Sequence, residues 1–250
     1  MTSSNLSHCC STGFLHEGKA KGEVKNIANI STYLIYPPDQ STQNVILILT
    51  DVIGHGFINA RLIADQFASK GYFVVMPDLF NGDSVPLNRP PGFQIMNWVQ
   101  NHLPLQTDRI IDVVLKEMRV KMGCEQIGGV GYCYGGKYVC RYLKKGMLDV
   151  GFMAHPTMVE ADELRGGLRG QMWFGVLMVA LVRDFVFSKE KRRESEDILD
   201  KLDVPYQINL FSDVEHGFAV RCDMEKPRQR FAKEQAFAHA VAWFDQYLKK

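Results

Sequence analysis

Cys133 is the side chain whose surroundings in the sequence best fit covalent chemistry. It is the centre of the run Gly131-Tyr132-Cys133-Tyr134-Gly135, which stands between an apolar stretch and a stretch with a helical pattern. Strand, tight glycine-flanked turn and helix is the setting of the nucleophile elbow G-x-S-x-G, here with Cys in place of Ser. The start of the following helix favours negative charge, so it would lower the pKa of a thiol there. Cys133 is therefore a candidate nucleophile for acyl transfer.

A cysteine nucleophile needs a base, and the base needs an acid that orients it. Asp184 and His216 follow Cys133 in the chain order nucleophile, acid, histidine. Each comes just after an apolar run that predicts a strand, so both belong at the carboxyl ends of parallel strands, where open α/β sheets bind ligands. Asp203 and Asp213 flank the last predicted strand and lie too close to His216 in sequence to be good rivals.

Alternating apolar runs and amphipathic segments predict the elements that would position these residues. Strands are expected at 33–36, 45–49, 72–76, 127–130, 150–154, within 172–182 and at 206–210. Helices are expected at 59–70, 107–122, 136–143, 188–202 and 226–248, with Thr107 and Ser188 as N-caps. This alternation predicts an α/β fold with a mostly parallel central sheet and helices on both faces.

The same pattern indicates one domain. The polar residues 1–30 are expected to form an irregular N-terminal lead-in, and residues 31–250 a single domain. A loop is expected over 81–92, where prolines cluster.

Composition limits the partners and the setting. The 250 residues carry 29 basic and 28 acidic side chains, a formal net charge of +1, so nucleic acid is not an expected partner. The apolar run 172–182 is too short to span a bilayer, and no signal peptide is evident, so we expect no membrane association. The six cysteines show no zinc-ligand spacing, which predicts free thiols, no metal site and a cytoplasmic location.

At this point the chain resembles the dienelactone hydrolase family, and its fungal members most. The resemblance runs from about residue 9 to about residue 248. It rests on Cys9-Cys10, Gly13-Phe14, His16-Glu17-Gly18, Leu62-Ile63-Ala64-Asp65, Gly71-Tyr72, Pro77-Asp78-Leu79-Phe80, the elbow through Lys137, His155-Pro156 and Glu215-His216-Gly217-Phe218-Ala219. It implies an α/β-hydrolase fold, a triad of Cys133, His216 and Asp184, and no cofactor. The family's namesake reaction opens an unsaturated lactone.

The resemblance also implies how the substrate would be held. The backbone N–H groups of Tyr134 and Val52 would form an oxyanion hole. Asp51 stands where the namesake enzymes have a Glu that helps to hold the resting thiol, and it is a candidate substrate contact. Those enzymes bind a substrate carboxylate with two arginines. Where the first of these arginines would stand, this chain has Asn81-Gly82-Asp83. Arg221 is a shifted substitute for the second arginine. The sequence therefore does not support an acidic dienelactone as the substrate.

Several side chains have a structural interpretation beside a functional one. His55, in a polar loop, is a candidate substrate contact. A structural hydrogen bond is the better account of His155, and core packing that of Cys140. Packing is also expected for Cys9-Cys10.

Taken together, the residues predict a cofactor-free hydrolase of a small-molecule lactone, ester or thioester, acting through an acyl-enzyme as a monomer or homodimer. Fungal secondary metabolism is the setting that the resemblance suggests. Two alternatives stay open. One is an auxiliary pathway protein that binds a polyketide-like intermediate. The other is a thiol redox sensor based on Cys133 or Cys9-Cys10, for which the spacing offers no resolving cysteine.

Overall fold

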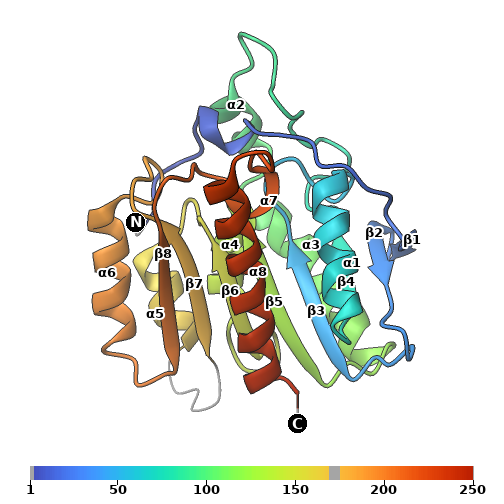
Figure 1. The fold of residues 1–250 in the computed structure, drawn as a ribbon. Coiled ribbons are helices and arrows are strands. Elements are labelled where there is room, and N and C mark those ends of the chain that lie inside the picture. Colours follow the sequence, from blue (N-terminus) through green and yellow to red (C-terminus); the bar gives the residue numbers. More distant parts are fainter. Residues whose placement is uncertain (1–2, 169–174, 250) are drawn as a thin grey trace.

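A single eight-stranded sheet forms the centre of the molecule (Figure 1). The computed structural model describes residues 3–168 and 175–249. The strand order is β1-β2-β4-β3-β5-β6-β7-β8. The strands are β1 (Glu23–Ile27), β2 (Ile30–Ile35), β3 (Asn44–Leu49), β4 (Phe73–Pro77), β5 (Gln126–Tyr132), β6 (Val150–Ala154), β7 (Val176–Leu181) and β8 (Tyr206–Phe211). From β4 to β8 neighbouring strands run parallel, while β1 and β2 are antiparallel additions, which confirms the predicted α/β architecture.

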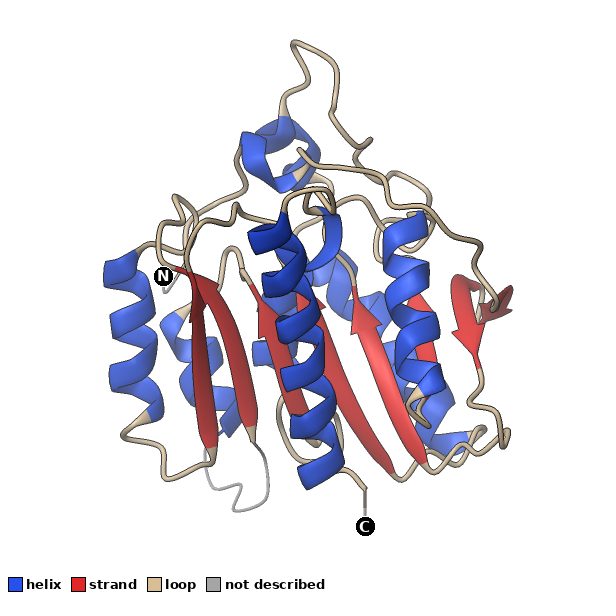
Figure 2. Cartoon of the chain, in the orientation of Figure 1, coloured by secondary structure: helices blue, strands red, loops and turns tan. Residues whose placement is uncertain are grey.

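Helices cover both faces of the sheet, as Figure 2 shows. Helices α1 (Ile58–Ser69) and α8 (Pro227–Tyr247) lie on one face, and α3 (Pro104–Val120) and α4 (Tyr134–Tyr142) on the other. The remaining helices are η1 (His8–Cys10, a 3₁₀ turn), α2 (Ile95–Gln100), α5 (Ala161–Leu168), α6 (Lys189–Leu199) and α7 (Phe218–Arg221). Within the described ranges, no helix combines the length and the apolar character that a bilayer crossing requires.

The strand order reverses beside β3, and this reversal opens a crevice at the end of the strand. The chain passes from β3 outward to β4, then returns to place β5 on the other side of β3, with Leu49 paired to Gly131. Loops that leave two adjacent parallel strands toward opposite faces open a crevice at their carboxyl ends. The segment after β3 begins at Thr50, and the segment after β5 begins at Cys133. Both therefore reach the same crevice.

Three predicted details need correction. Helix α3 has Leu103 as its N-cap and Pro104 in its first turn, so the prediction of Thr107 as N-cap was wrong. Proline suits the first helical position because the N–H that it lacks would have no partner there. Helix α2 follows the predicted loop and was not expected. Part of the predicted irregular lead-in forms β1, which pairs with β2 through backbone hydrogen bonds that polar, exposed residues can also make.

An N-cap and a buried strand that were predicted agree with the structure. The Ser188 side chain caps α6 by accepting a hydrogen bond from the Lys191 amide, as predicted. The buried strand expected within 172–182 is β7, although residues 172–174 lie outside the described part of the chain.

The chain's first residues cross the carboxyl ends of the strands, where the blue segment runs in Figure 1. We call residues 3–14 the N-terminal strap. At one end, the Ser4 amide donates to the carbonyl of Val186, and the Met158 amide donates to that of Ser4. At the other end, the Phe14 amide donates to the carbonyl of Arg221 across 2.9 Å. The strap is therefore tied to both sides of the crevice.

Candidate active site

Cys133 occupies a strained turn between β5 and α4. Its φ of 51° and ψ of −108° are unusual for a residue with a side chain. The turn is fixed by hydrogen bonds from the Cys133 amide to the Ala154 carbonyl and from the Thr157 amide to the Cys133 carbonyl. A Cβ on Gly135 would collide with the backbone carbonyl of Leu49. The glycine thus lets the elbow pack directly on the end of β3.

His216 and Asp184 are joined in the way that a catalytic pair requires. Nδ1 of His216 lies 2.9 Å from Oδ2 of Asp184. The other carboxylate oxygen of Asp184 accepts a hydrogen bond of 2.8 Å from the Val186 amide, which fixes its orientation. Both side chains are almost completely buried. Since Nδ1 is engaged, Nε2 is the ring nitrogen left for chemistry, and it has no hydrogen-bond partner among the described residues.

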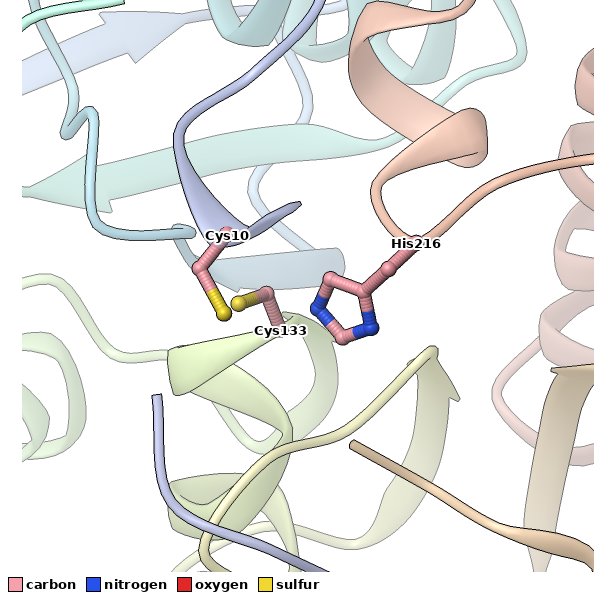
Figure 3. A group of neighbouring side chains, drawn as sticks. All are labelled: Cys10, Cys133 and His216. Atoms are coloured by element: carbon pink, nitrogen blue, oxygen red, sulfur yellow. The ribbon is translucent and has the colours of Figure 1, made fainter. Parts of the chain in front are cut away.

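The structure brings a second thiol to the same place. The sulfur atoms of Cys10 and Cys133 and a ring nitrogen of His216 all lie within 4.8 Å of one another. In Figure 3 the two sulfur atoms point toward each other, beside the imidazole. All three residues are buried. Cys10 belongs to the N-terminal strap, far from Cys133 in sequence, so no spacing rule could have found it. Its occurrence in the Cys9-Cys10 motif was the one available signal.

A buried ion pair holds the strap over the elbow. The Arg221 guanidinium donates from Nη1 to the Asp51 carboxylate. Its Nε donates to the carbonyl of Thr12 across 2.9 Å, and its Nη2 donates to the carbonyl of Cys9 across 3.0 Å. Arg221 is only 2% exposed, and Asp51 1%. Both were predicted as substrate contacts, but their polar groups are directed at protein groups that position Cys10.

Two backbone amides at the crevice are free to bind an oxyanion. Tyr134 is the first residue of α4, and Val52 lies in the turn after β3. Among the described residues, neither amide has a hydrogen-bond acceptor. By contrast, the next amides in each segment are engaged: Gly135 donates to Thr50, and Ile53 to the carboxylate of Asp51.

Both ring nitrogens of His55 face neighbouring side chains. Nε2 lies 2.9 Å from the Ser31 hydroxyl, and Nδ1 lies 3.7 Å from an Asp78 carboxylate oxygen. Burial lowers the pKa of His55. These contacts favour a structural role over the predicted substrate contact.

His155 lies against His216, without the hydrogen bond that the sequence suggested for its ring. It follows β6 with a φ of 41° and is completely buried. Its ring packs edge-on against that of His216, with centroids 4.9 Å apart. Neither ring nitrogen has a hydrogen-bond partner among the described residues. Burial, together with the charges of His216 and Arg221, lowers the pKa of His155 well below its usual value, so the ring stays neutral.

The charges of His216 and Asp184 shift each other's pKa toward the ionised forms. Burial lowers the pKa of His216, but the negative charge of a Cys10 thiolate and the Asp184 carboxylate outweigh this and raise it to about 10. Burial raises the pKa of Asp184, but the hydrogen bond and charge of His216 bring it below its usual value. An imidazolium of His216 beside the Asp184 carboxylate is therefore the favoured state of this pair at neutral pH.

Comparisons with known proteins agree with the fold. Residues 30–248 match the model of the dienelactone hydrolase family. The chain is 59% identical to hydrolase pyvD of Aspergillus violaceofuscus, covering 100% of both chains, and 49% identical to hydrolase tropI of Talaromyces stipitatus, covering 97% of this chain and 96% of that one. The fold is shared with the dienelactone hydrolase of Anabaena variabilis, at a TM-score of 0.63 and 14% identity, over 94% of this chain and 100% of that one. The chain belongs to the dienelactone hydrolase family.

Proposed function

We propose that this protein hydrolyses lactone, ester or thioester bonds in small molecules, with Cys133 as nucleophile and His216 and Asp184 as its base and orienting acid. The proposal rests on the orientation of the His216 ring. Its Nδ1 lies 2.9 Å from Asp184, and its Nε2, beside the buried thiols, has no hydrogen-bond partner among the described residues. A histidine oriented in this way can move a proton between the nucleophile, the leaving group and water.

The first half-reaction forms a thioester. The Cys133 thiolate attacks the substrate carbonyl carbon, a C–S bond forms, and the π electrons move to the oxygen. The amides of Tyr134 and Val52 donate to that oxyanion, and loss of one such donor costs roughly 3 kcal/mol in comparable sites. The adduct then collapses. The bond to the leaving group breaks, and the His216 imidazolium gives its proton to the departing alkoxide or thiolate.

The second half-reaction releases the acid. Neutral His216 takes a proton from water while the oxygen attacks the thioester carbon. Collapse of this adduct breaks the C–S bond and restores the Cys133 thiolate and the His216 imidazolium. No cofactor enters these steps.

Thiolate chemistry narrows the class of substrate. A thiolate is itself easily expelled from a tetrahedral adduct, so productive collapse requires a leaving group that departs at least as readily. Strained lactones, activated esters and thioesters meet this condition better than unactivated amides do. Arg221 directs its Nε, Nη1 and Nη2 at protein oxygens, so it is not the ligand of a substrate carboxylate.

Substrate access requires a movement of the covering segments. Cys133 has no exposed surface, and Cys10 of the strap lies beside its sulfur. A carbonyl carbon can reach the sulfur only after the strap or a neighbouring loop is displaced.

The test is hydrolysis of a short-chain aryl ester and a small lactone by Cys133→Ala, with Cys9→Ser as the matched thiol control. We expect turnover to be lost in Cys133→Ala and kept in Cys9→Ser. Mass spectrometry of the wild-type protein quenched during turnover should find the acyl group on Cys133. Undiminished hydrolysis by Cys133→Ala would overturn the proposal. Substrate binding without any acyl adduct or turnover would favour the auxiliary role instead.

A further inference from the structure

Two thiols and one imidazole that converge in a buried space form the ligand set of a soft metal site. The ligating atoms of Cys10, Cys133 and His216 lie within 4.8 Å of one another, and none of the three residues is more than 6% exposed. Hydrolysis as proposed above uses only one of the two thiols. The presence of Cys10 at this point is therefore unexplained by the reaction.

The spacing is close to that of tetrahedral coordination. Zn–S bonds of about 2.3 Å and Zn–N bonds of about 2.0–2.1 Å place neighbouring ligand atoms roughly 3.5–3.8 Å apart. The three atoms here need only small side-chain movements to reach such distances. Thiolates and imidazole are the ligands that Zn²⁺ and related soft cations prefer over carboxylates and water.

The surroundings of His216 meet a further requirement of such sites. A metal-bound histidine usually donates its other ring N–H to a carboxylate, which fixes the ring and strengthens it as a ligand. Nδ1 of His216 lies 2.9 Å from Asp184, and the buried Nε2 faces the thiols with no partner among the described residues.

We propose that Cys10, Cys133 and His216 bind one soft divalent cation of the Zn²⁺ class, with water or an added anion in the fourth position, and that the bound cation reversibly blocks the Cys133 sulfur. Coordination by two thiolates and neutral imidazole neutralises the cation's two charges. The protons held by the thiols and the imidazole leave to solvent as the three metal–ligand bonds form, and no group is oxidised or reduced.

The strap places Cys10 in this site. The Arg221 guanidinium holds the carbonyl of Cys9, so the following residue, Cys10, is presented to the site in the folded protein. Cation binding is expected even if the protein hydrolyses none of the substrates tested.

The experiment is a titration of the reduced, metal-stripped full-length protein with Co²⁺, followed by thiolate-to-cobalt charge-transfer absorption. We expect saturation at one cation per chain, displacement by Zn²⁺ and release by a chelator. The affinity should fall at least about tenfold in Cys10→Ser and in Cys133→Ser. Cys9→Ser is the matched control, because it removes the adjacent thiol, and it should bind as the wild type does.

A second measurement uses only the wild-type protein, so a variant that fails to fold does not leave the question open. Zn²⁺ should slow iodoacetamide alkylation of Cys10 and Cys133 together, by at least about tenfold, in peptide maps. Absence of saturable Co²⁺ binding, equal binding by folded Cys10→Ser, or Zn²⁺ protection of Cys133 without Cys10 would each overturn the proposal.

Discussion

Arg221 donates a hydrogen bond of 3.0 Å to the carbonyl oxygen of Cys9, which joins a helix near the end of the chain to the strap at its beginning. The same guanidinium contacts Asp51 at the end of β3 and the carbonyl of Thr12. One buried side chain thus connects three segments that surround the elbow. Arg221 acts on the site through the position of the strap.

The buried Arg221–Asp51 pair should matter much more for stability than an exposed pair of the same types. Arg221→Gln leaves the Asp51 carboxylate buried without its counter-ion, so we expect a loss of about 3–5 kcal/mol in the free energy of unfolding. Arg228→Gln removes the exposed partner of Asp213 and should cost no more than about 1 kcal/mol. Urea denaturation measures both. Equal losses would show that the buried pair is not what anchors the strap.

Asp184→Asn should reduce kcat far more than KM, because the amide cannot stabilise the imidazolium of His216. By analogy with other triads, the decrease should be on the order of 10³–10⁴-fold. Asp213→Asn is the control, since Asp213 lies near His216 in sequence but contacts Arg228. Steady-state kinetics on an aryl ester gives kcat and KM for both variants. A decrease with Asp213→Asn as large as that with Asp184→Asn would contradict the assignment.

Gly135→Ala should prevent folding or lower the free energy of unfolding by several kcal/mol, since its methyl group would collide with the Leu49 carbonyl. Gly166→Ala is the contrasting change, because a Cβ there meets nothing within 4 Å and alanine favours the helix that contains it. Circular dichroism during thermal unfolding compares the two variants. A Gly135→Ala protein as stable as the wild type would mean that the elbow packs less closely on β3.

His155 should make the wild-type protein sensitive to acid. Its pKa is lowered in the folded state, so below the unfolded value of about 6.5 the unfolded chain binds more protons, and stability falls as the pH decreases. His155→Phe removes this contribution. Between about pH 7 and pH 5 its free energy of unfolding should decline less steeply than that of the wild type, by up to about 1.4 kcal/mol per pH unit. Parallel curves from urea unfolding would refute a neutral, buried His155.

Local sequence patterns were sufficient for most of the fold. Continuous apolar runs such as 45–49 predicted buried parallel strands, and the glycine-flanked Cys133 predicted the elbow, because both depend on neighbours in the chain. Chain order, the place of each residue after a predicted strand and the family resemblance suggested that Asp184 would meet His216, and they lie 2.9 Å apart. The start of α3 was misjudged because a proline competed with a threonine as the signal for its first turn.

Contacts between distant segments could not be read in the same way. No local period relates Cys10 to Cys133, or Asp51 to Arg221, since these pairs depend on the path of the strap and on the docking of α7. Arg221 was predicted as a substrate ligand because the resemblance implies a carboxylate-binding arginine soon after His216. Its burial follows from partners 170 and 212 positions away in the sequence.

The strap also sets an order in which the molecule can be completed. Residues 3–14 are synthesised well before some of their partners, which include the carbonyl of Val186 and the side chain of Arg221. During synthesis the strap cannot make these contacts until residue 221 has emerged. Cys10 is therefore made long before Cys133, yet Arg221 can hold the strap beside Cys133 only after α7 has folded.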